Sequence, residues 1–167
     1  GFSYGGMVVT GAVEHLASRI AELVYLDAFL PRDGEALYDL TGQSAAPPPA
    51  PPGPTAPPGQ PWLVDPPPRT PPSDAAVAAW FAARRTAHPR RCFTEAVHLP
   101  RPLESYDFGL TYVKATGAPR PEGGDAFWRA ADRVRSSPRW RYREIGSDHT
   151  VPTTRPAELA ALLLELT

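Results

Sequence analysis

Apolar and polar residues follow one another along the chain in blocks that predict helices and strands in turn. Residues 4–20 carry small and apolar side chains on nearly every side, which is typical of a helix buried against a sheet. Residues 21–29 follow as a short run rich in β-forming residues. A helix followed so closely by a strand indicates a parallel α/β unit.

The rest of the chain continues this alternation after a break at residues 31–34. The expected elements are a short helix over 35–42, a helix over 74–86, a strand over 110–115, a helix over 124–136, a strand over 140–145 and a helix over 155–166. A loop is expected from His88 to Gly109. The residues that should turn the helix over 124–136 toward the core are Phe127, Trp128, Ala131 and Val134.

Proline is unusually abundant, with 23 residues concentrated in one region. Proline recurs so often over 45–72 that neither a helix nor a central strand is possible, because each proline removes a backbone donor and fixes φ. We expect an extended, partly mobile insertion with polyproline II character there.

The charge and the cysteine content exclude several classes of protein. The net charge of −1 and the pI near 6.5 give no reason to expect nucleic acid or an anionic membrane as a partner. No apolar run reaches transmembrane length. The lone Cys92 excludes an internal disulfide and a cysteine-based metal cluster, which fits a reducing, cytoplasmic location. His88 and His98 lack metal-ligand spacing, so no metal is expected.

The first five residues, Gly-Phe-Ser-Tyr-Gly, match the G-x-S-x-G nucleophile elbow. In this motif a serine lies on a sharp turn between a strand and a helix, with its hydroxyl exposed. Such a turn brings neighbouring backbone close together, so we expect Gly1 and Gly5 at positions where a Cβ would clash. Ser3 is then the candidate nucleophile.

A candidate general base for Ser3 stands near the end of the chain. Residues 146–150, Gly-Ser-Asp-His-Thr, lie directly after the last predicted strand and before the last helix. Hydrolases with such an elbow have the chain order serine, acid, histidine, so His149 stands where the general base belongs. A serine attacks a carbonyl only when such a base removes its proton. The backbone N–H of Tyr4 is the expected oxyanion donor.

The elbow, the alternation and the late histidine together resemble the α/β-hydrolases, and within them the small esterases related to plant methylesterases and hydroxynitrile lyases. The similar segments are 1–6 (elbow), 24–31 (the next strand and turn), 91–95 (the end of a cap), 111–113 (a core strand), and 148–149 with 155–159 (histidine loop and final helix). The resemblance implies an α/β fold with a larger sheet, of which the last three strands and their flanking helices lie in this chain. The strand that should precede the elbow is absent, so the chain is expected to be the C-terminal part of a larger hydrolase.

The resemblance also implies a division of the chain into a core and a cap. The core would comprise residues 1–30 and 108–167. The cap or lid insertion would comprise residues 31–107 and would contain the proline-rich segment 45–72.

The acid of the implied triad is the point where the sequence departs from this family. An acid is expected directly after the strand at 110–115, yet Ala-Thr-Gly stands at 115–117. Asp27 is the leading substitute, because it lies at the carboxyl end of the preceding predicted strand. The remaining candidates are Asp125 and Glu122, which lie farther along the loop, and Asp148, which adjoins the base in sequence.

The implied activity is hydrolysis of small, uncharged carboxylic esters through an acyl-enzyme on Ser3, with no cofactor. The side chains expected to line an apolar substrate pocket are Phe2, Trp80 and Phe93. A hydroxynitrile-lyase-like enzyme is the alternative, but relatives of that type carry a lysine just after the base, where Thr150 stands here. A truncated or inactive relative that serves as a binding module is the third hypothesis.

Overall fold

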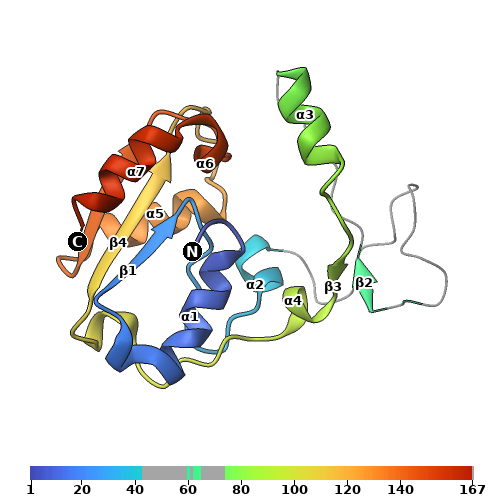
Figure 1. The fold of residues 1–167 in the computed structure, drawn as a ribbon. Helices are drawn as coiled ribbons and strands as arrows, with labels where there is room; N and C mark the ends of the chain where they lie inside the picture. Colours follow the sequence, from blue (N-terminus) through green and yellow to red (C-terminus); the bar gives the residue numbers. More distant parts are fainter. Residues whose placement is uncertain (43–59, 61, 65–73, 167) are drawn as a thin grey trace.

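The three longest strands of the described chain form one parallel sheet. The computed structural model describes residues 1–42, 60, 62–64 and 74–166. The strands of the sheet are β1 (Glu22–Leu26), β4 (Gly109–Ala115) and β5 (Trp140–Ile145), in the order β1-β4-β5 (Figure 1). Both pairings are parallel, which confirms the predicted α/β class.

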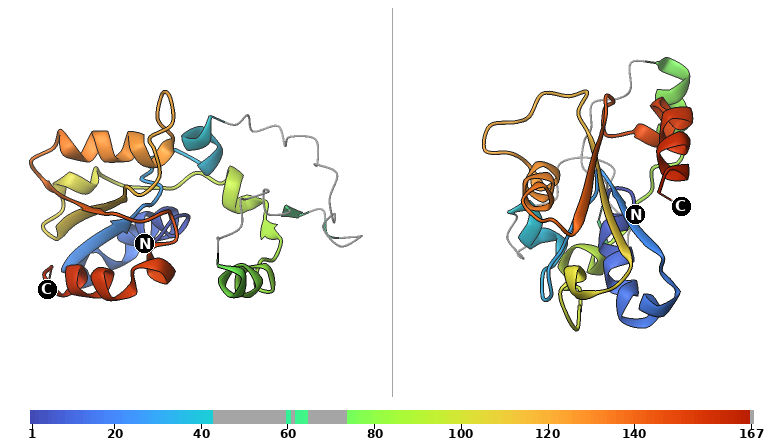
Figure 2. Two further views of the ribbon diagram at one scale, coloured as in Figure 1. Left: turned by 90° about the horizontal axis from the view of Figure 1, so that it is seen from above. Right: turned by 90° about the vertical axis from the view of Figure 1, so that its left-hand side faces the viewer.

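Side chains that alternate along these strands form two cores, one on each face of the sheet. The larger core contains Tyr25 and Tyr112, and the smaller contains Val113 and Ile145. The helices that flank the sheet are α1 (Gly5–Leu16), α5 (Ala126–Arg135), α6 (Val151–Thr154) and α7 (Pro156–Leu164). Residues of α1 and α5 belong to the larger core, whereas α6 and α7 pack on the smaller one. Figure 2 shows α5 and α7 on opposite sides of the sheet.

Several element boundaries follow the sequence prediction closely. The helix expected over 4–20 is α1, which is followed by a 3₁₀ turn, η1 (Ala17–Arg19). The short helix expected over 35–42 is α2 (Leu37–Thr41), which ends at Gly42 with a φ of +69°. Glycine adopts this left-handed conformation without steric cost, so its position explains where the helix stops.

The segment between His88 and Gly109 is not the loop that the sequence predicted. It contains β3 (His88–Pro89), α4 (Arg91–Thr94) and a 3₁₀ turn, η2 (Leu103–Ser105). β3 pairs antiparallel with β2 (Leu63–Val64). Leu99, Leu103 and Tyr106 are buried in the larger core. These elements are too short to display a helical or strand period, so the sequence pattern missed them.

The helix expected over 74–86 is α3 (Ala75–Ala82), which lies apart from the sheet (Figure 1). Asp74 caps it as predicted, because its side chain accepts a 2.9 Å hydrogen bond from the Val77 N–H. None of the residues of α3 is buried. Most of the proline-rich segment 45–72 lies outside the described residues. None of the helices in the described ranges is long and apolar enough to cross a bilayer.

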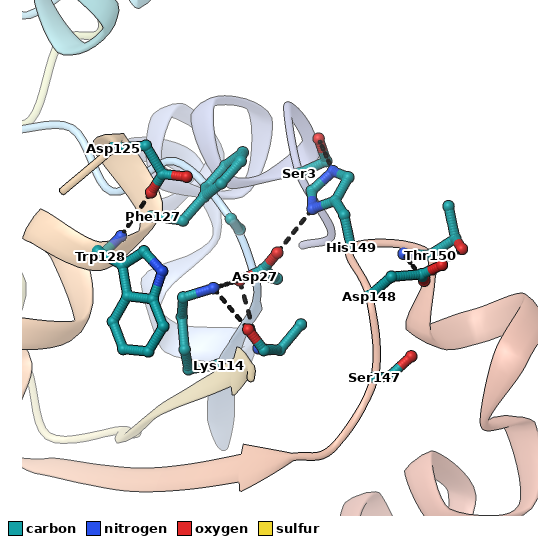
Figure 3. A network of polar contacts seen from close by, with 12 residues as sticks. Ser3, Asp27, Lys114, Asp125, Phe127, Trp128, Ser147, Asp148, His149 and Thr150 are labelled. Atoms are coloured by element: carbon teal, nitrogen blue, oxygen red, sulfur yellow. Dashed lines mark hydrogen bonds and ion pairs between the residues drawn. The ribbon is translucent and has the colours of Figure 1, made fainter. Parts of the chain in front are cut away.

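The amphipathic helix expected over 124–136 is α5, and Asp125 caps it by accepting a 2.9 Å hydrogen bond from the Trp128 N–H. The prediction of its core face was right for Ala131 and Val134, which are buried. Phe127 and Trp128 are only half-buried. Trp128 nevertheless packs against the larger core, as predicted, and Figure 3 shows both side chains beside the candidate site.

Candidate active site

Ser3 lies on a sharp turn between a short stretch of extended chain and α1. Phe2 pairs in parallel with Leu26 at the end of β1, and helix α1 begins only three residues later at Gly5. The φ of Ser3 is +54°, a left-handed conformation that residues with a Cβ rarely adopt. The turn is stabilised by hydrogen bonds from the Ser3 N–H to the Leu26 carbonyl at 3.3 Å and from the Gly6 N–H to the Ser3 carbonyl at 3.1 Å.

The glycines around Ser3 allow this turn to approach its neighbours, although not quite in the expected way. A Cβ on Gly1 would lie 2.6 Å from the Gly5 carbonyl oxygen. A Cβ on Gly6 would lie 2.0 Å from the Phe29 carbonyl oxygen. The expectation for Gly5 was wrong, because a Cβ there would meet nothing within 4 Å. Gly6, which the pentapeptide pattern does not include, permits the close contact instead.

Asp27 lies directly after β1 in a second left-handed turn, with a φ of +39°. Its side chain is buried, with 2% of the residue exposed. The Asp27 N–H donates to the Val113 carbonyl at 2.7 Å, and the Phe29 N–H donates to the Ser3 carbonyl at 3.1 Å. The turn that carries Asp27 is therefore hydrogen-bonded both to the central strand and to the elbow.

His149 joins Ser3 and Asp27 in one chain of hydrogen bonds (Figure 3). Its Nε2 lies 2.9 Å from Ser3 Oγ, and its Nδ1 lies 2.7 Å from Asp27 Oδ2. An ionised carboxylate only accepts hydrogen bonds, so Nδ1 carries the proton and Nε2 is left to accept from the serine hydroxyl. The structure thus brings His149 to Ser3 and Asp27, which lie 146 and 122 positions before it in the sequence.

The other acids that the sequence left open have different partners. Asp125 caps α5. Asp148 Oδ1 accepts from the N–H and the hydroxyl of Thr150 at 2.8 and 2.6 Å. Glu122 is exposed. Among the four candidate acids, Asp27 alone forms a hydrogen bond with His149.

The loop that carries His149 is fixed at its base. The Gly117 N–H donates to the Ser147 carbonyl at 2.7 Å, and a Cβ on Gly117 would lie 2.6 Å from the Ser147 carbonyl carbon. Ser147 Oγ and Thr154 Oγ1 lie 2.5 Å apart, which ties the loop to α6. An acid was expected directly after the strand at 110–115, where residues 115–117 stand, and Gly117 of that segment provides space for the histidine loop.

Aromatic rings enclose His149 on two sides. The centroids of the Phe2 and Phe127 rings each lie 4.9 Å from that of the imidazole, and the Phe127 ring is stacked on it. Phe29 packs on Phe127 with centroids 4.7 Å apart. These rings restrict water around the imidazole and orient it, which strengthens its hydrogen bonds.

Lys114 is a residue of this site that the sequence analysis missed. Its Nζ lies 2.6 Å from Asp27 Oδ1, and the residue is 4% exposed. Burial by itself would raise the pKa of Asp27, but the hydrogen bonds and charges of His149 and Lys114 outweigh it, so the pKa of Asp27 lies below its usual value. The only available signal in the sequence was a charged residue inside an apolar strand.

Tyr4 places its backbone N–H beside Ser3 at the start of α1. No hydrogen bond joins this N–H to another residue in the described ranges. A helix N-terminus also favours negative charge. These features are compatible with the expected role of the Tyr4 N–H as an oxyanion donor, which stays a prediction.

The residues expected to form a pocket are only partly gathered here. Phe2 adjoins His149 and is 36% exposed. Phe93 lies farther out, and its ring contacts His88, which in turn contacts the ring of Tyr4. Trp80 is not at the site: it is 49% exposed on α3, where its ring contacts Phe81 and the guanidinium of Arg84. A cleft of about 280 Å³ borders the elbow, and Tyr4, Met7, Cys92 and Val97 are among the residues that line it.

The fold corresponds to that of a solved hydrolase. No family model matches the sequence. The structure superposes with a TM-score of 0.70 and 20% sequence identity on a Paenibacillus protein, over 99% of this chain and 69% of that chain. That protein is described as an extracellular alpha/beta-hydrolase that shares structural and functional homology with tobacco salicylic acid binding protein 2. This chain therefore has the α/β-hydrolase fold, as the sequence predicted.

A curated relative adds a more specific similarity. The chain is 49% identical over 47 residues to a carbendazim hydrolyzing esterase from Nocardioides sp. (strain SG-4G). The match covers 28% of this chain and 19% of the esterase. The similarity to this esterase supports an esterase-like α/β-hydrolase. The predicted cytoplasmic location stays a prediction, since the Paenibacillus protein is described as extracellular.

Proposed function

We propose that the protein hydrolyses small, uncharged carboxylic esters, with Ser3 as nucleophile, His149 as general base and Asp27 as the acid of the triad. The observation that carries this proposal is the chain of hydrogen bonds from Ser3 Oγ through His149 to Asp27, at 2.9 and 2.7 Å. The left-handed φ of Ser3 supports it, because strain of this kind is typical of a nucleophile elbow.

The reaction follows from the positions of these atoms. His149 Nε2 removes the hydroxyl proton as Ser3 Oγ attacks the acyl carbon, and the carbonyl oxygen becomes an oxyanion. The Tyr4 N–H donates to that oxyanion, and one such donor typically contributes about 3–4 kcal/mol. Asp27 stabilises the imidazolium through Nδ1. His149 then protonates the leaving alcohol, and a water activated by the same imidazole hydrolyses the acyl-enzyme.

The surroundings of His149 favour an uncharged substrate. Phe2 and Phe127 flank the imidazole, so a group bound to Ser3 meets apolar surface. Lys114 is buried behind Asp27 and paired with it, so its charge is not offered to a substrate. Simple aryl esters are the first substrates to test, and the local similarity to a carbendazim hydrolyzing esterase makes carbendazim the second.

Steady-state hydrolysis of p-nitrophenyl acetate tests the assignment of the nucleophile. Ser3→Ala should lower kcat by at least about 10³-fold, because no other group replaces the attacking oxygen. Ser136→Ala is the matched control, since Ser136 is exposed and its hydroxyl donates only to the Arg133 carbonyl. Turnover that survives in Ser3→Ala would contradict the proposal, as would a folded wild-type protein that hydrolyses neither substrate.

A further inference from the structure

Lys114 is the only lysine in the sequence, and every other residue with a permanent positive side-chain charge is arginine. It lies in the central strand β4, and 5% of its side chain is exposed. A buried ammonium is costly unless it is paired and hydrogen-bonded. The reaction proposed above uses the carboxylate that pairs with it but does not use the lysine itself.

The surroundings of Lys114 saturate its ammonium group. Nζ donates to Asp27 Oδ1 at 2.6 Å and to the Ala115 carbonyl at 2.7 Å. It also lies 4.6 Å from the centroid of the Trp128 ring, which favours a cation. An ammonium is a compact point charge that fits three close partners, whereas the planar guanidinium of arginine is larger and presents a fixed fork.

The two oxygens of Asp27 have separate partners. Oδ1 accepts from Lys114 Nζ and, at 3.3 Å, from the Ala115 N–H. Oδ2 accepts from His149 Nδ1 at 2.7 Å. Because Lys114 and the Ala115 N–H, both on β4, bind Oδ1, the carboxylate cannot rotate away from the imidazole. Figure 3 shows Lys114 and His149 on opposite sides of Asp27.

We propose that Lys114 is a positioning residue for the proposed ester hydrolysis: it holds Asp27 by Oδ1, so that an ionised Oδ2 faces His149. The inference rests on the function proposed above. Lys114 acts through Asp27 and His149 and does not touch the substrate.

This role predicts a change in the pH dependence of the reaction. The titratable groups that face Asp27 are Lys114 and the Tyr112 hydroxyl from β4 and His149 from the loop after β5. Activity requires an ionised Asp27 and a neutral His149. Lys114 lowers the pKa of Asp27, so loss of its positive charge raises that pKa and moves the acid limb of kcat/KM to higher pH.

The test compares Lys114→Met with the wild-type protein in p-nitrophenyl acetate hydrolysis between pH 5 and 9. We expect the acid limb to move upward by about one pH unit and kcat at pH 7 to fall roughly tenfold, with KM changed less than about twofold. Arg143→Met is the matched control, because it removes an exposed positive charge from the neighbouring strand β5. Its acid limb should stay in place. A merely structural role for Lys114 would lower the amount of active protein without moving the limb.

Lys114→Gln covers the case in which Lys114→Met does not fold. Glutamine still donates to Asp27 but carries no charge, so the acid limb should again move upward. An acid limb that stays at the wild-type pH in the folded variant overturns the proposal.

A direct measurement does not depend on activity. Lysine-selective ¹⁵N labelling gives one Nζ resonance, because the chain has one lysine. In wild-type protein and in Ser3→Ala this resonance should change with pH between pH 5 and 9, and Asp27→Asn should abolish that change. If the chemical shift of the Nζ resonance does not change over this pH range, the positioning role is wrong.

The two proposals fail in different ways. If wild-type protein reacts with a serine-directed fluorophosphonate at Ser3 but the Nζ resonance and the acid limb are unaffected, only the role of Lys114 is wrong. If Ser3 does not react although the Nζ resonance changes with pH, the hydrolase function fails and the coupling of the three side chains stands.

Discussion

At the scale of single residues, Asp27 is the point where the contacts of the site meet. It adopts a left-handed φ, lies 2% exposed, and accepts hydrogen bonds from Lys114 and His149 on different oxygens. A buried carboxylate with two cationic or proton-donating partners stays ionised, which explains why its pKa lies below the usual value. The residue therefore serves both the stability of the fold and the proposed chemistry.

Asp27→Asn should remove most of the activity. An amide that donates toward Nδ1 favours the wrong tautomer of His149, so Nε2 no longer accepts from Ser3. We expect kcat for p-nitrophenyl acetate to fall by about 10³–10⁴-fold with a small change in KM. A variant that keeps more than about a tenth of wild-type kcat would point to another acid, and Asp148→Asn is the comparison to make.

The same substitution should destabilise the protein, because it leaves the charge of Lys114 buried without a counter-charge. The expected loss in the free energy of unfolding is about 3–5 kcal/mol, measured by urea denaturation at pH 7. Adding Lys114→Met to Asp27→Asn removes the unpaired charge and should restore part of this loss. A double variant less stable than Asp27→Asn alone would show that the pair is not coupled as described.

At the scale of elements, the site depends on how closely α1 approaches the turn after β1. The contact is made by backbone, since the Phe29 N–H donates to the Ser3 carbonyl and the Phe29 carbonyl lies against Gly6. The small side chain of Ala28 also lies next to Gly6. The first turn of α1 thus holds Ser3 and the Asp27 turn in a fixed relation.

Two adjacent glycines of this turn offer a matched pair of variants. Gly6→Ala places a Cβ 2.0 Å from the Phe29 carbonyl oxygen, so backbone must move. We expect it to lower the free energy of unfolding by more than about 2 kcal/mol and to reduce kcat by at least tenfold. Gly5→Ala meets open space in a helix and should be neutral or stabilise by up to about 1 kcal/mol. Equal effects of the two variants in urea denaturation and ester hydrolysis would contradict this account.

The sequence predicted those elements that are long enough to show a hydrophobic period. Residues 110–115 and 140–145 were predicted as strands because they are apolar or alternating over a full strand length, and β4 and β5 lie there. The elements α4 and β3 were missed because each spans too few residues to show a period. Helix α3 was predicted from its cap and spacing, but its distance from the sheet was not, since no local pattern encodes where an element packs.

At the scale of the whole molecule, the site is assembled from turns at one end of the parallel sheet. Ser3, Asp27 and His149 each follow a strand or an extended segment, so the carboxyl ends of the strands bring them together. Their motifs made Ser3 and His149 predictable from sequence. Lys114 was not, because its contact with Asp27 spans 87 positions and depends on the pairing of β1 with β4.

The ion pair between Asp27 and Lys114 should also affect how the free energy of unfolding depends on pH in acid. The pKa of Asp27 is lower in the folded than in the unfolded chain, so its contribution is complete above the unfolded value of about 3.9. It is lost as pH falls through the folded value. The free energy of unfolding should thus fall below pH 4 by up to about 1.4 kcal/mol per pH unit from this group. As pH falls below 4, the urea midpoint of the double variant Asp27→Asn/Lys114→Met should decrease less steeply than that of the wild-type protein. The same pH dependence in both proteins would exclude Asp27 as the source.

The most direct test of the central claim is intact-mass measurement after reaction with a serine-directed fluorophosphonate. The account predicts one adduct on the wild-type protein, located on the peptide that contains Ser3 and absent from Ser3→Ala. Ser136→Ala should label like the wild-type protein. The Ser136 hydroxyl is exposed and donates to the Arg133 carbonyl, so no base activates it as a nucleophile. A folded protein without an adduct, or an adduct that persists in Ser3→Ala, would contradict the assignment of Ser3 as the nucleophile.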